Sequence, residues 1–378
     1  MRVLHVLLNL GFEGAEQAAV DLAAWREKDV EAHLVYLSEP SDGRQLAQQR
    51  GIEVHGPLCA SAQSKTCVVA LQKLVDELDV DVVHSHMTYA GNWCAALRAG
   101  GKVRRVHSVR EQIDKVAWYG RKFLWPKIIA RADRLVCEYA SVEADLVGKY
   151  SAAKGKTVVI PDGIDPSRAA ASRTRADVRS EMGIPSDAMV VLQVAPVTDR
   201  NRGHLQLIEA MRKVCNEFPY TYLLVAGGLK NLGLLDELNA QINGLDLHRR
   251  VSLLAARDDV ADLLGASDIY VAPALEDGTP TVLVEAMMAG LPVVATTVGA
   301  CPEVVKDSET GILVPPGESD ALATAIMELS ANPAWRQRLA AAGKEMAMDT
   351  YSLERVGARH AEMYRALVAG EPAKAQGG

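Results

Sequence analysis

The sequence predicts two α/β domains, each built on a doubly wound parallel sheet. Short apolar runs rich in valine, leucine and isoleucine alternate with amphipathic helical stretches along nearly the whole chain, a pattern typical of parallel strands buried on both faces. The chain has 378 residues, which exceeds one ordinary domain. Hydrophobic residues make up 49% of it and aromatic residues only 5%, which favours helices on parallel sheets over a sandwich or a propeller.

The first predicted domain covers residues 1–168. Its opening strand, Val3 to Leu8, leads into a G-x-x-G turn and then a helix. We expect Gly14, together with Gly11, to let the backbone approach a ligand, although a plain tight turn would use the same residues. The full dinucleotide fingerprint is absent, so NAD binding is not predicted. Further strands are expected at 32–37, 52–54, 81–87, 135–137 and 157–160, with helices near 43–50 and 68–78.

The second predicted domain covers residues 169–350. A polar run at 167–179 indicates the connection, because apolar periodicity lapses there and charges dominate. Residues 351–378 are expected to form a last helix that packs back across the first domain, followed by a flexible tail. Strands of the second sheet are expected at 189–194, 222–226, 251–254, 268–272 and 291–296.

The most informative stretch runs from Ala272 to Val305. It combines a polar loop at 276–281, a short apolar helix that ends at Gly290, and a strand buried on both faces. In such a unit the helix N-terminus, with its free amides and positive dipole end, lies at the carboxyl edge of the sheet. We therefore expect an anion or a sugar to bind at this edge.

A second loop, Asp199 to His204, follows the first strand of the second domain and precedes a helix. A guanidinium there can bind phosphate oxygens with two parallel hydrogen bonds, while the helix amides add to the field that attracts anions. We choose Arg202 for this role, with Arg200 as the rival. The alternative is that these arginines serve solubility alone.

Composition and scattered residues limit the other classes of function. The formal net charge of −7 argues against a general nucleic-acid binder. Six cysteines without C-x-x-C spacing indicate neither a zinc site nor a disulfide framework, so a reducing cytosol is expected. His84 and His86 share one face of a strand, but no third ligand is evident, and hydrogen-bonded histidines are the expected alternative to a metal site. No apolar run reaches the length of about 18–20 residues that spans a bilayer.

Basic and aromatic residues accumulate between residues 98 and 134. Eleven lysines and arginines accompany Trp118, Tyr119, Phe123 and Trp125 there, in a chain that is acidic as a whole. Such a stretch can bind anionic lipid headgroups. A solvated face with an aromatic core stripe is the equally weighted alternative.

Together these motifs resemble a large family, the retaining nucleotide-sugar glycosyltransferases of family 4, also called group 1. This family includes sucrose and glycogen synthases and bacterial phosphatidylinositol mannosyltransferases. The resemblance is nearly end to end and implies the GT-B fold, with two Rossmann-like domains facing across a cleft. It rests on Gly14 to Glu16, Asp81 to His86, Val158 to Asp165, Arg202 to His204, and Asp277 to Glu285 with the Ala-Met-Met-Ala-Gly-Leu-Pro run that follows.

The resemblance also implies roles for single residues. Glu285 matches the second acid of the family's E-x7-E element and would accept hydrogen bonds from the nucleotide ribose. Asp277 matches the first acid, and Gly278, Thr279, Pro280 and Thr281 match the loop that contacts the donor sugar and phosphates. Arg202 would bind the diphosphate. Arg110 falls where many relatives carry a histidine near the reacting sugar.

Three positions depart from the family pattern. The first acid is Asp277 rather than Glu, with Glu276 beside it. Pro196 occupies the place of a frequent phosphate-binding arginine, and Asp162 replaces the common asparagine before Gly163. These departures concern donor binding and the choice of sugar.

The implied activity is hexosyl transfer, with retained anomeric configuration, from a nucleotide-diphosphate sugar to a glycan or lipid-linked acceptor in polysaccharide, lipopolysaccharide or other cell-envelope biosynthesis. The resemblance implies neither a cofactor nor a metal. The cysteine pattern predicts a cytoplasmic protein, and the basic and aromatic residues at 98–134 predict peripheral contact to anionic lipid at the inner face of the plasma membrane. The alternatives are a non-catalytic GT-B partner or scaffold protein and a GT-B nucleotide-sugar epimerase.

Overall fold

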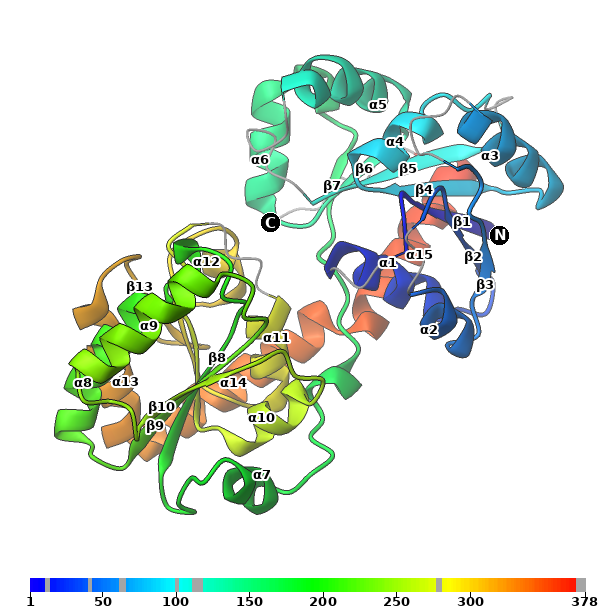
Figure 1. Cartoon of the computed structure of the whole chain (residues 1–378). Coiled ribbons are helices and arrows are strands. Elements are labelled where there is room, and N and C mark those ends of the chain that lie inside the picture. Colours follow the sequence, from blue (N-terminus) through cyan, green and yellow to red (C-terminus); the bar gives the residue numbers. More distant parts are fainter. Residues whose placement is uncertain are drawn as a thin grey trace. The chain divides into compact units, whose positions relative to one another are not determined.

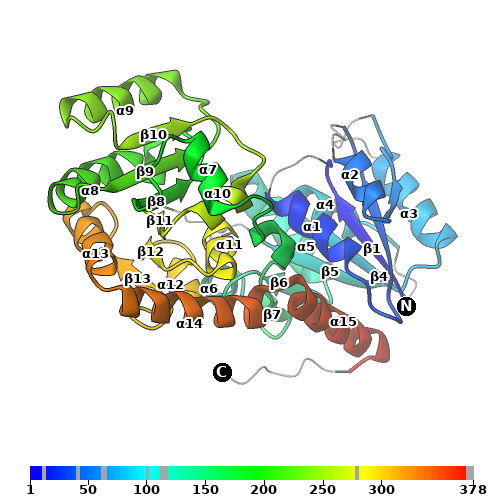
Figure 2. The same ribbon diagram turned by 90° about the horizontal axis from the view of Figure 1, so that it is seen from below.

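The computed structural model describes residues 1–10, 14–39, 43–60, 66–98, 102–110, 118–276 and 281–371. The chain divides into two compact units. Figures 1 and 2 label the helices and strands of both units and colour them along the sequence. Unit 1 contains residues 1–164 and the chain end from Leu353 onward, and unit 2 contains Asp165–Ser352. Each unit is described by itself.

Unit 1 is built on a seven-stranded sheet in the order β3-β2-β1-β4-β5-β6-β7, in which every neighbouring pair is parallel. Helices cover both faces of it, so the predicted doubly wound architecture is confirmed. The strands are β1 (Arg2–Leu7), β2 (Glu31–Tyr36), β3 (Glu53–His55), β4 (Val82–His86), β5 (Arg104–Val109), β6 (Arg134–Cys137) and β7 (Thr157–Val159). The helices are α1 (Gly14–Ala24), α2 (Arg44–Gln49), α3 (Thr66–Glu77), α4 (Thr88–Cys94), a π-helical turn η2 (Gly120–Leu124), α5 (Trp125–Arg131), α6 (Ala140–Lys149), the 3₁₀ turn η3 (Ser151–Ala153) and α15 (Leu353–Ala369).

One face of this sheet changes from apolar to polar along its strands. Because side chains alternate between the faces with a period of two, Val3, Val82, Val106, Val136 and Ile160 share one face and form a common core cluster. The next residues on the same face, toward the carboxyl ends of the strands, are polar: His5, His84, His86, Ser108, Arg110, Glu138 and Asp162. The amino halves of the strands therefore build the core, and the carboxyl halves build a polar site.

Helix α15 completes unit 1 although it lies at the end of the chain. Val356, Tyr364 and Leu367 belong to the same core cluster as Val3 and Val82. Gly357 allows the close packing, since a Cβ at this position would lie 2.3 Å from Cδ2 of Trp25. Trp25 directly follows α1, so α15 and α1 lie against each other.

Unit 2 contains a six-stranded parallel sheet in the order β10-β9-β8-β11-β12-β13. Its strands are β8 (Met189–Val194), β9 (Thr221–Ala226), β10 (Val251–Leu254), β11 (Ile269–Ala272), β12 (Val293–Thr296) and β13 (Ile312–Val314). Its helices are α7 (Arg175–Glu181), α8 (His204–Glu217), α9 (Leu232–Gly244), α10 (Val260–Ala266), α11 (Thr281–Ala289), α12 (Cys301–Val304), α13 (Ser319–Ala331) and α14 (Pro333–Tyr351), with the 3₁₀ turns η4 (Pro166–Ala169) and η5 (Arg200–Arg202). The chain leaves β8 toward β9 on one side and reaches β11 on the other. In open parallel sheets, ligands bind at the carboxyl ends of strands where the order reverses in this way.

Cys59 and Cys67 form a disulfide with their Cα atoms 5.5 Å apart, so the expectation of no disulfide is wrong for this pair. The separation of eight residues does not by itself predict a disulfide, because it is the fold that brings the segment after β3 close to the start of α3.

None of the helices in the described ranges is long and apolar enough to cross a membrane.

Candidate active site

In unit 2 the loops after β8 and β11 are joined by direct contacts. The amide of Leu275 donates to the carbonyl of Asn201 at 2.7 Å, and the side chain of Asn201 donates to Glu276 at 3.3 Å. Gly203 makes this approach possible, because its φ is 72° and a Cβ there would lie 1.8 Å from the carbonyl oxygen of Pro273. The two loops that the sequence singled out are therefore neighbours at the carboxyl edge of the sheet.

The two candidate arginines of this region differ in their partners. Arg200 is exposed and its Nη2 lies 2.7 Å from Glu237 on α9. Arg202 is half-buried, and within the described ranges no ion pair of its guanidinium is found. Its carbonyl accepts a hydrogen bond from the buried side chain of Gln193, at 2.9 Å. The turn at 199–203 is thus fixed, while the Arg202 guanidinium remains available for a ligand.

Glu285 is buried in α11, with 4% of its surface exposed. Its Oε1 lies 2.6 Å from Nη2 of Arg168, a residue of η4 in the same unit. The carboxylate is therefore held by a cation that the sequence analysis did not identify. Its charge also raises the pKa of the neighbouring Tyr270, an effect that adds to the larger effect of burial.

The other predicted donor residues are placed only in part. Thr281 is the first residue of α11, and Gly14 is the first residue of α1. Asp277, Gly278, Thr279 and Pro280 lie outside the described residues. The roles proposed for this loop stay predictions.

In unit 1 Arg110 follows the carboxyl end of β5 and binds Asp162 through two nitrogens. Nε of Arg110 donates to Oδ2 of Asp162 at 2.9 Å, and Nη2 donates to Oδ1 at 2.6 Å. The Arg110 side chain is 9% exposed and that of Asp162 28%. Although burial opposes its charge, Asp162 raises the pKa of Arg110. The guanidinium is therefore fixed in the charged form.

Glu138 is a third member of this group and follows β6. It is buried, and burial together with the charge and a hydrogen bond of Asp162 raises its pKa well above the ordinary value, against the opposing effect of Arg110. Glu138, Asp162 and Arg110 line one pocket with Ser108, His360 and the α1 residues Ala18 and Leu22. The pocket thus presents a fixed cation, a carboxylate and a carboxyl group that holds a proton more strongly than usual.

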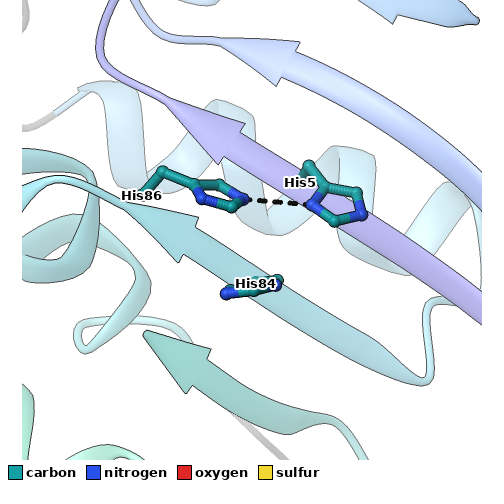
Figure 3. A group of neighbouring side chains, drawn as sticks. All are labelled: His5, His84 and His86. Atoms are coloured by element: carbon teal, nitrogen blue, oxygen red, sulfur yellow. Dashed lines mark hydrogen bonds between the residues drawn. The ribbon is translucent and has the colours of Figure 1, made fainter. Parts of the chain in front are cut away.

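Three histidines, His5, His84 and His86, lie close together on strands β1 and β4 (Figure 3). Nη1 of Arg110 lies 3.1 Å from Nδ1 of His86. Since arginine can only donate, His86 accepts at Nδ1, and in its neutral form carries its proton on Nε2. That nitrogen lies 3.0 Å from Nδ1 of His5, which therefore accepts. His84 contacts the hydroxyls of Tyr364 at 2.6 Å and Ser108 at 2.8 Å.

These histidines are neutral in the folded protein. Burial is the largest cause that lowers their pKa values, to about 3 for His5 and about 4 for His360, and well below the ordinary value for His84 and His86. The ring nitrogens of His5, His84 and His86 lie within 4.8 Å of one another, so the expectation of no third residue beside His84 and His86 is wrong. Because Nδ1 of His5 and both nitrogens of His86 take part in hydrogen bonds, the arrangement matches the predicted alternative of hydrogen-bonded histidines.

Sequence reasoning missed His5, Glu138, His360 and Arg168 as site residues. The first two carry a readable signal, because each falls two residues after a core valine on the same strand face, as do His84 and Ser108. Arg168 carries none, since its partner Glu285 lies on a distant helix of the same unit.

The comparison with family models covers most of the chain. Residues 174–346 match the model of glycosyl transferases group 1, and residues 12–168 match that of glycosyltransferase family 4. The phosphatidyl-myo-inositol mannosyltransferase of Mycobacterium leprae is 31% identical over 277 residues, which are 71% of this chain and 68% of that protein. The chain belongs to the group 1 glycosyltransferase family.

Two further comparisons concern another curated relative and a solved structure. The D-inositol 3-phosphate glycosyltransferase of Streptomyces avermitilis is 28% identical over 303 residues, 75% of this chain, and the match spans 62% of that relative's length. The structure of HepE from Anabaena in complex with UDP is similar with a TM-score of 0.84 at 20% identity, over 97% of this chain and 100% of that one. The structural similarity supports the fold, two Rossmann-like domains of the GT-B type.

Proposed function

We propose that this family member transfers a hexosyl group from a nucleotide-diphosphate sugar to a glycan or lipid-linked acceptor, with retained configuration and without a metal. The observation that carries the proposal is the half-buried Arg202 beside the loop that leads into α11. Relatives support the substrate class: the Anabaena protein binds UDP, and the Mycobacterium leprae relative is a mannosyltransferase by name. Cell-envelope or polysaccharide biosynthesis is the proposed setting.

In the proposed chemistry, each polar group of unit 2 binds one part of the nucleotide-diphosphate sugar. The Arg202 guanidinium and the amides at the start of α11 would stabilise the diphosphate as it leaves. Glu285, oriented by Arg168, would accept hydrogen bonds from the ribose. The leaving diphosphate would take the proton of the acceptor hydroxyl, so that positioning and electrostatics supply the rate enhancement without a protein nucleophile. Arg110 would act near the reacting sugar.

We predict that Arg202→Ala and Glu285→Ala each lower turnover at least about tenfold, because a hydrogen bond to a charged group contributes about 1.5–3 kcal/mol. The measurement is sugar transfer with the donor first identified by a thermal-stabilisation screen of nucleotide sugars. Arg200→Ala should have a smaller effect because that side chain is engaged by Glu237. Arg212→Ala, which breaks an exposed pair within α8, is the control. Full turnover in both Arg202→Ala and Glu285→Ala would remove the site assignment.

The same assay separates the proposed transferase from its alternatives. A scaffold protein would bind the nucleotide sugar weakly or not at all and would release no nucleotide. An epimerase would rearrange the donor with no acceptor present. A transferase requires the acceptor for rapid nucleotide release.

We also propose peripheral membrane contact through the aromatic cluster of Trp118, Tyr119 and Phe123. Trp118 is 64% exposed and Phe123 49%, whereas Trp125 of the same stretch is buried. The three rings contact one another, and Lys122 lies over the Phe123 ring at 5.7 Å. An exposed aromatic group with adjacent cations fits an anionic headgroup region.

We predict that Phe123→Ser weakens partitioning onto vesicles containing anionic phospholipid about tenfold. The variant loses the free energy that the wild type gains by burying one phenylalanine side chain in the membrane. Co-sedimentation measures the bound fraction. Tyr220→Ser is the matched control, because Tyr220 is 65% exposed and belongs to unit 2. A bound fraction that changes neither in Phe123→Ser nor with the anionic lipid content would contradict membrane contact through this aromatic cluster.

A further inference from the structure

Two adjacent strands of unit 1 carry the same short pattern, a glutamate and a histidine two residues apart. These are Glu31 and His33 on β2 and Glu53 and His55 on β3. The strands are parallel, with His33 opposite Glu53. Because residues two apart share a face, all four side chains are on one side of the sheet edge.

This side is not the one that bears Arg110. Val35, two residues after His33, packs with Leu4 and Leu71, whereas Leu34 and Val54 pack with Leu7 on the opposite face. Glu31 and Glu53 also begin their strands, while Arg110 follows the end of β5. The group is therefore separate from the proposed glycosyl-transfer site.

Three imidazole nitrogens of this group are buried without a hydrogen-bond partner. His33 is 4% exposed, yet neither of its ring nitrogens has a hydrogen-bond partner, and the same holds for Nε2 of His55. Buried polar atoms of native proteins are nearly always satisfied, so three such nitrogens in one group require an explanation. The nearest charged groups are the carboxylates: Glu53 lies 3.4 Å from Nδ1 of His33 and 3.7 Å from Nε2 of His55.

These separations fit ligands around one ion better than they fit hydrogen bonds. Two ligands bound to a tetrahedral zinc ion at about 2.1 Å lie about 3.4 Å from each other. The ligand atoms of His33, Glu53 and His55 lie within 4.8 Å of one another, so small side-chain rotations would bring them to a common centre. Two imidazoles and one carboxylate are also a ligand set that zinc uses, with a water as fourth ligand.

The second carboxylate of the group, Glu31, is positioned to orient His33. Glu31 lies 3.5 Å from Nε2 of His33 and is held by Nε of Arg2 at 3.1 Å. A carboxylate at that nitrogen favours the tautomer with the proton on Nε2 and leaves Nδ1 free for a metal, an outer contact that most metal-bound histidines have.

The cluster of His5, His84 and His86 does not share these properties. There the lone pair of His5 Nδ1 accepts from His86, and Arg110, a cation, contacts His86. The group at β2 and β3 has unsatisfied nitrogens and two carboxylates instead.

We propose that His33, Glu53 and His55 bind one zinc ion, with Glu31 orienting His33. The ion would connect the edge strand β3, which has only three residues, to β2. This site is independent of the proposed transfer reaction.

The test uses the full chain, treated with EDTA and dialysed, and titrated with ZnCl₂ in competition with a chromophoric chelator. We expect one equivalent to bind, with affinity at least about tenfold lower in Glu53→Gln and in His33→Gln. Glu53→Gln is the decisive variant, because the Glu53 side chain is 63% exposed and its replacement leaves the core intact. Cobalt(II) in place of zinc should show the visible absorption of a tetrahedral ion.

His248→Gln is the matched control, since Nδ1 of His248 lies 3.2 Å from Asp246 in an exposed pair on unit 2. It should leave the affinity unchanged. Binding of less than one equivalent, equal affinity of the wild type and Glu53→Gln, or loss of the bound ion in His86→Asn but not in His33→Gln would each overturn the proposal. None of these measurements depends on sugar transfer, so the zinc test stays valid even if the proposed transferase activity is not found.

Discussion

Lowering the pH from 7.5 to 5 is expected to reduce the free energy of unfolding of unit 1 by about 6 kcal/mol through three buried histidines. Burial lowers the pKa of His5 and His107 to about 3 and that of His360 to about 4. In the unfolded chain each returns to about 6.5. The folded-state pKa values are thus depressed, and the stability is complete above pH 6.5 and lost as the pH falls toward the folded values.

The magnitude follows from proton binding. At pH 5 an unfolded histidine is almost fully protonated and a folded one with a pKa of about 3 is almost fully neutral, a difference of about 2 kcal/mol for each residue. His84 and His86, whose pKa values are also lowered, act in the same direction. Glu138 acts in the opposite direction, because its pKa is raised and its folded form gains a proton first. Histidines outnumber it, so acid destabilises the unit.

Urea unfolding at the two pH values, followed by tryptophan fluorescence, measures this effect. Four of the five tryptophans belong to unit 1, namely Trp25, Trp93, Trp118 and Trp125, so the signal reports mainly on this unit. His360→Gln should shrink the difference between pH 7.5 and 5 by about 2 kcal/mol. His248→Gln, at an exposed position, should not change it. Equal free energies of unfolding at both pH values in the wild type would contradict the neutral histidine chain.

The sequence predicted both sheets because their physics is local. A strand buried on both faces must be apolar along its length, and Met189 to Val194 or Val293 to Thr296 show this without any knowledge of neighbours. The polar ends of the strands in unit 1 were readable for the same reason. Val82 is followed at intervals of two by His84 and His86, and Val106 by Ser108 and Arg110, so the change from core to site lies within one strand.

Pairings between distant segments could not be read in this way. Arg168 meets Glu285 only because η4 contacts α11, and Asp162 meets Arg110 only because β7 and β5 flank β6. Nothing in the spacing of Cys59 and Cys67 distinguishes a bonded pair from two free thiols. Such contacts depend on sheet order, which the alternation of strands and helices does not determine.

Replacing Arg110 by methionine is expected to destabilise unit 1 by about 3–5 kcal/mol, the usual effect of removing one partner from a buried ion pair. Methionine keeps the unbranched length of the side chain but supplies no charge. Asp162 then loses its three hydrogen bonds from Arg110, and His86 loses the donor at Nδ1. Sugar transfer should fall at least about tenfold as well, if Arg110 acts near the reacting sugar.

The double variant Arg110→Met with Asp162→Asn distinguishes the interaction energy of the pair from the separate effects of the two residues on stability. Since the uncompensated carboxylate causes most of the loss, removing its charge should restore about 1–3 kcal/mol. Equilibrium unfolding of the four proteins of this cycle gives the coupling energy. Independent effects, with no recovery in the double variant, would mean that Asp162 does not depend on Arg110 as a counter-ion.

The pH dependence supplies a second check, because Glu138 contributes to stability in the opposite direction from the buried histidines. Arg110 lowers the pKa of Glu138, while burial and Asp162 raise it. Without the guanidinium this opposing effect is lost, so the folded-state pKa of Glu138 rises further above the unfolded one. Stability that depends on this proton is present at low pH and lost as the pH rises. Arg110→Met should therefore lose less stability than the wild type between pH 7.5 and 6, although the histidines still destabilise it below that range.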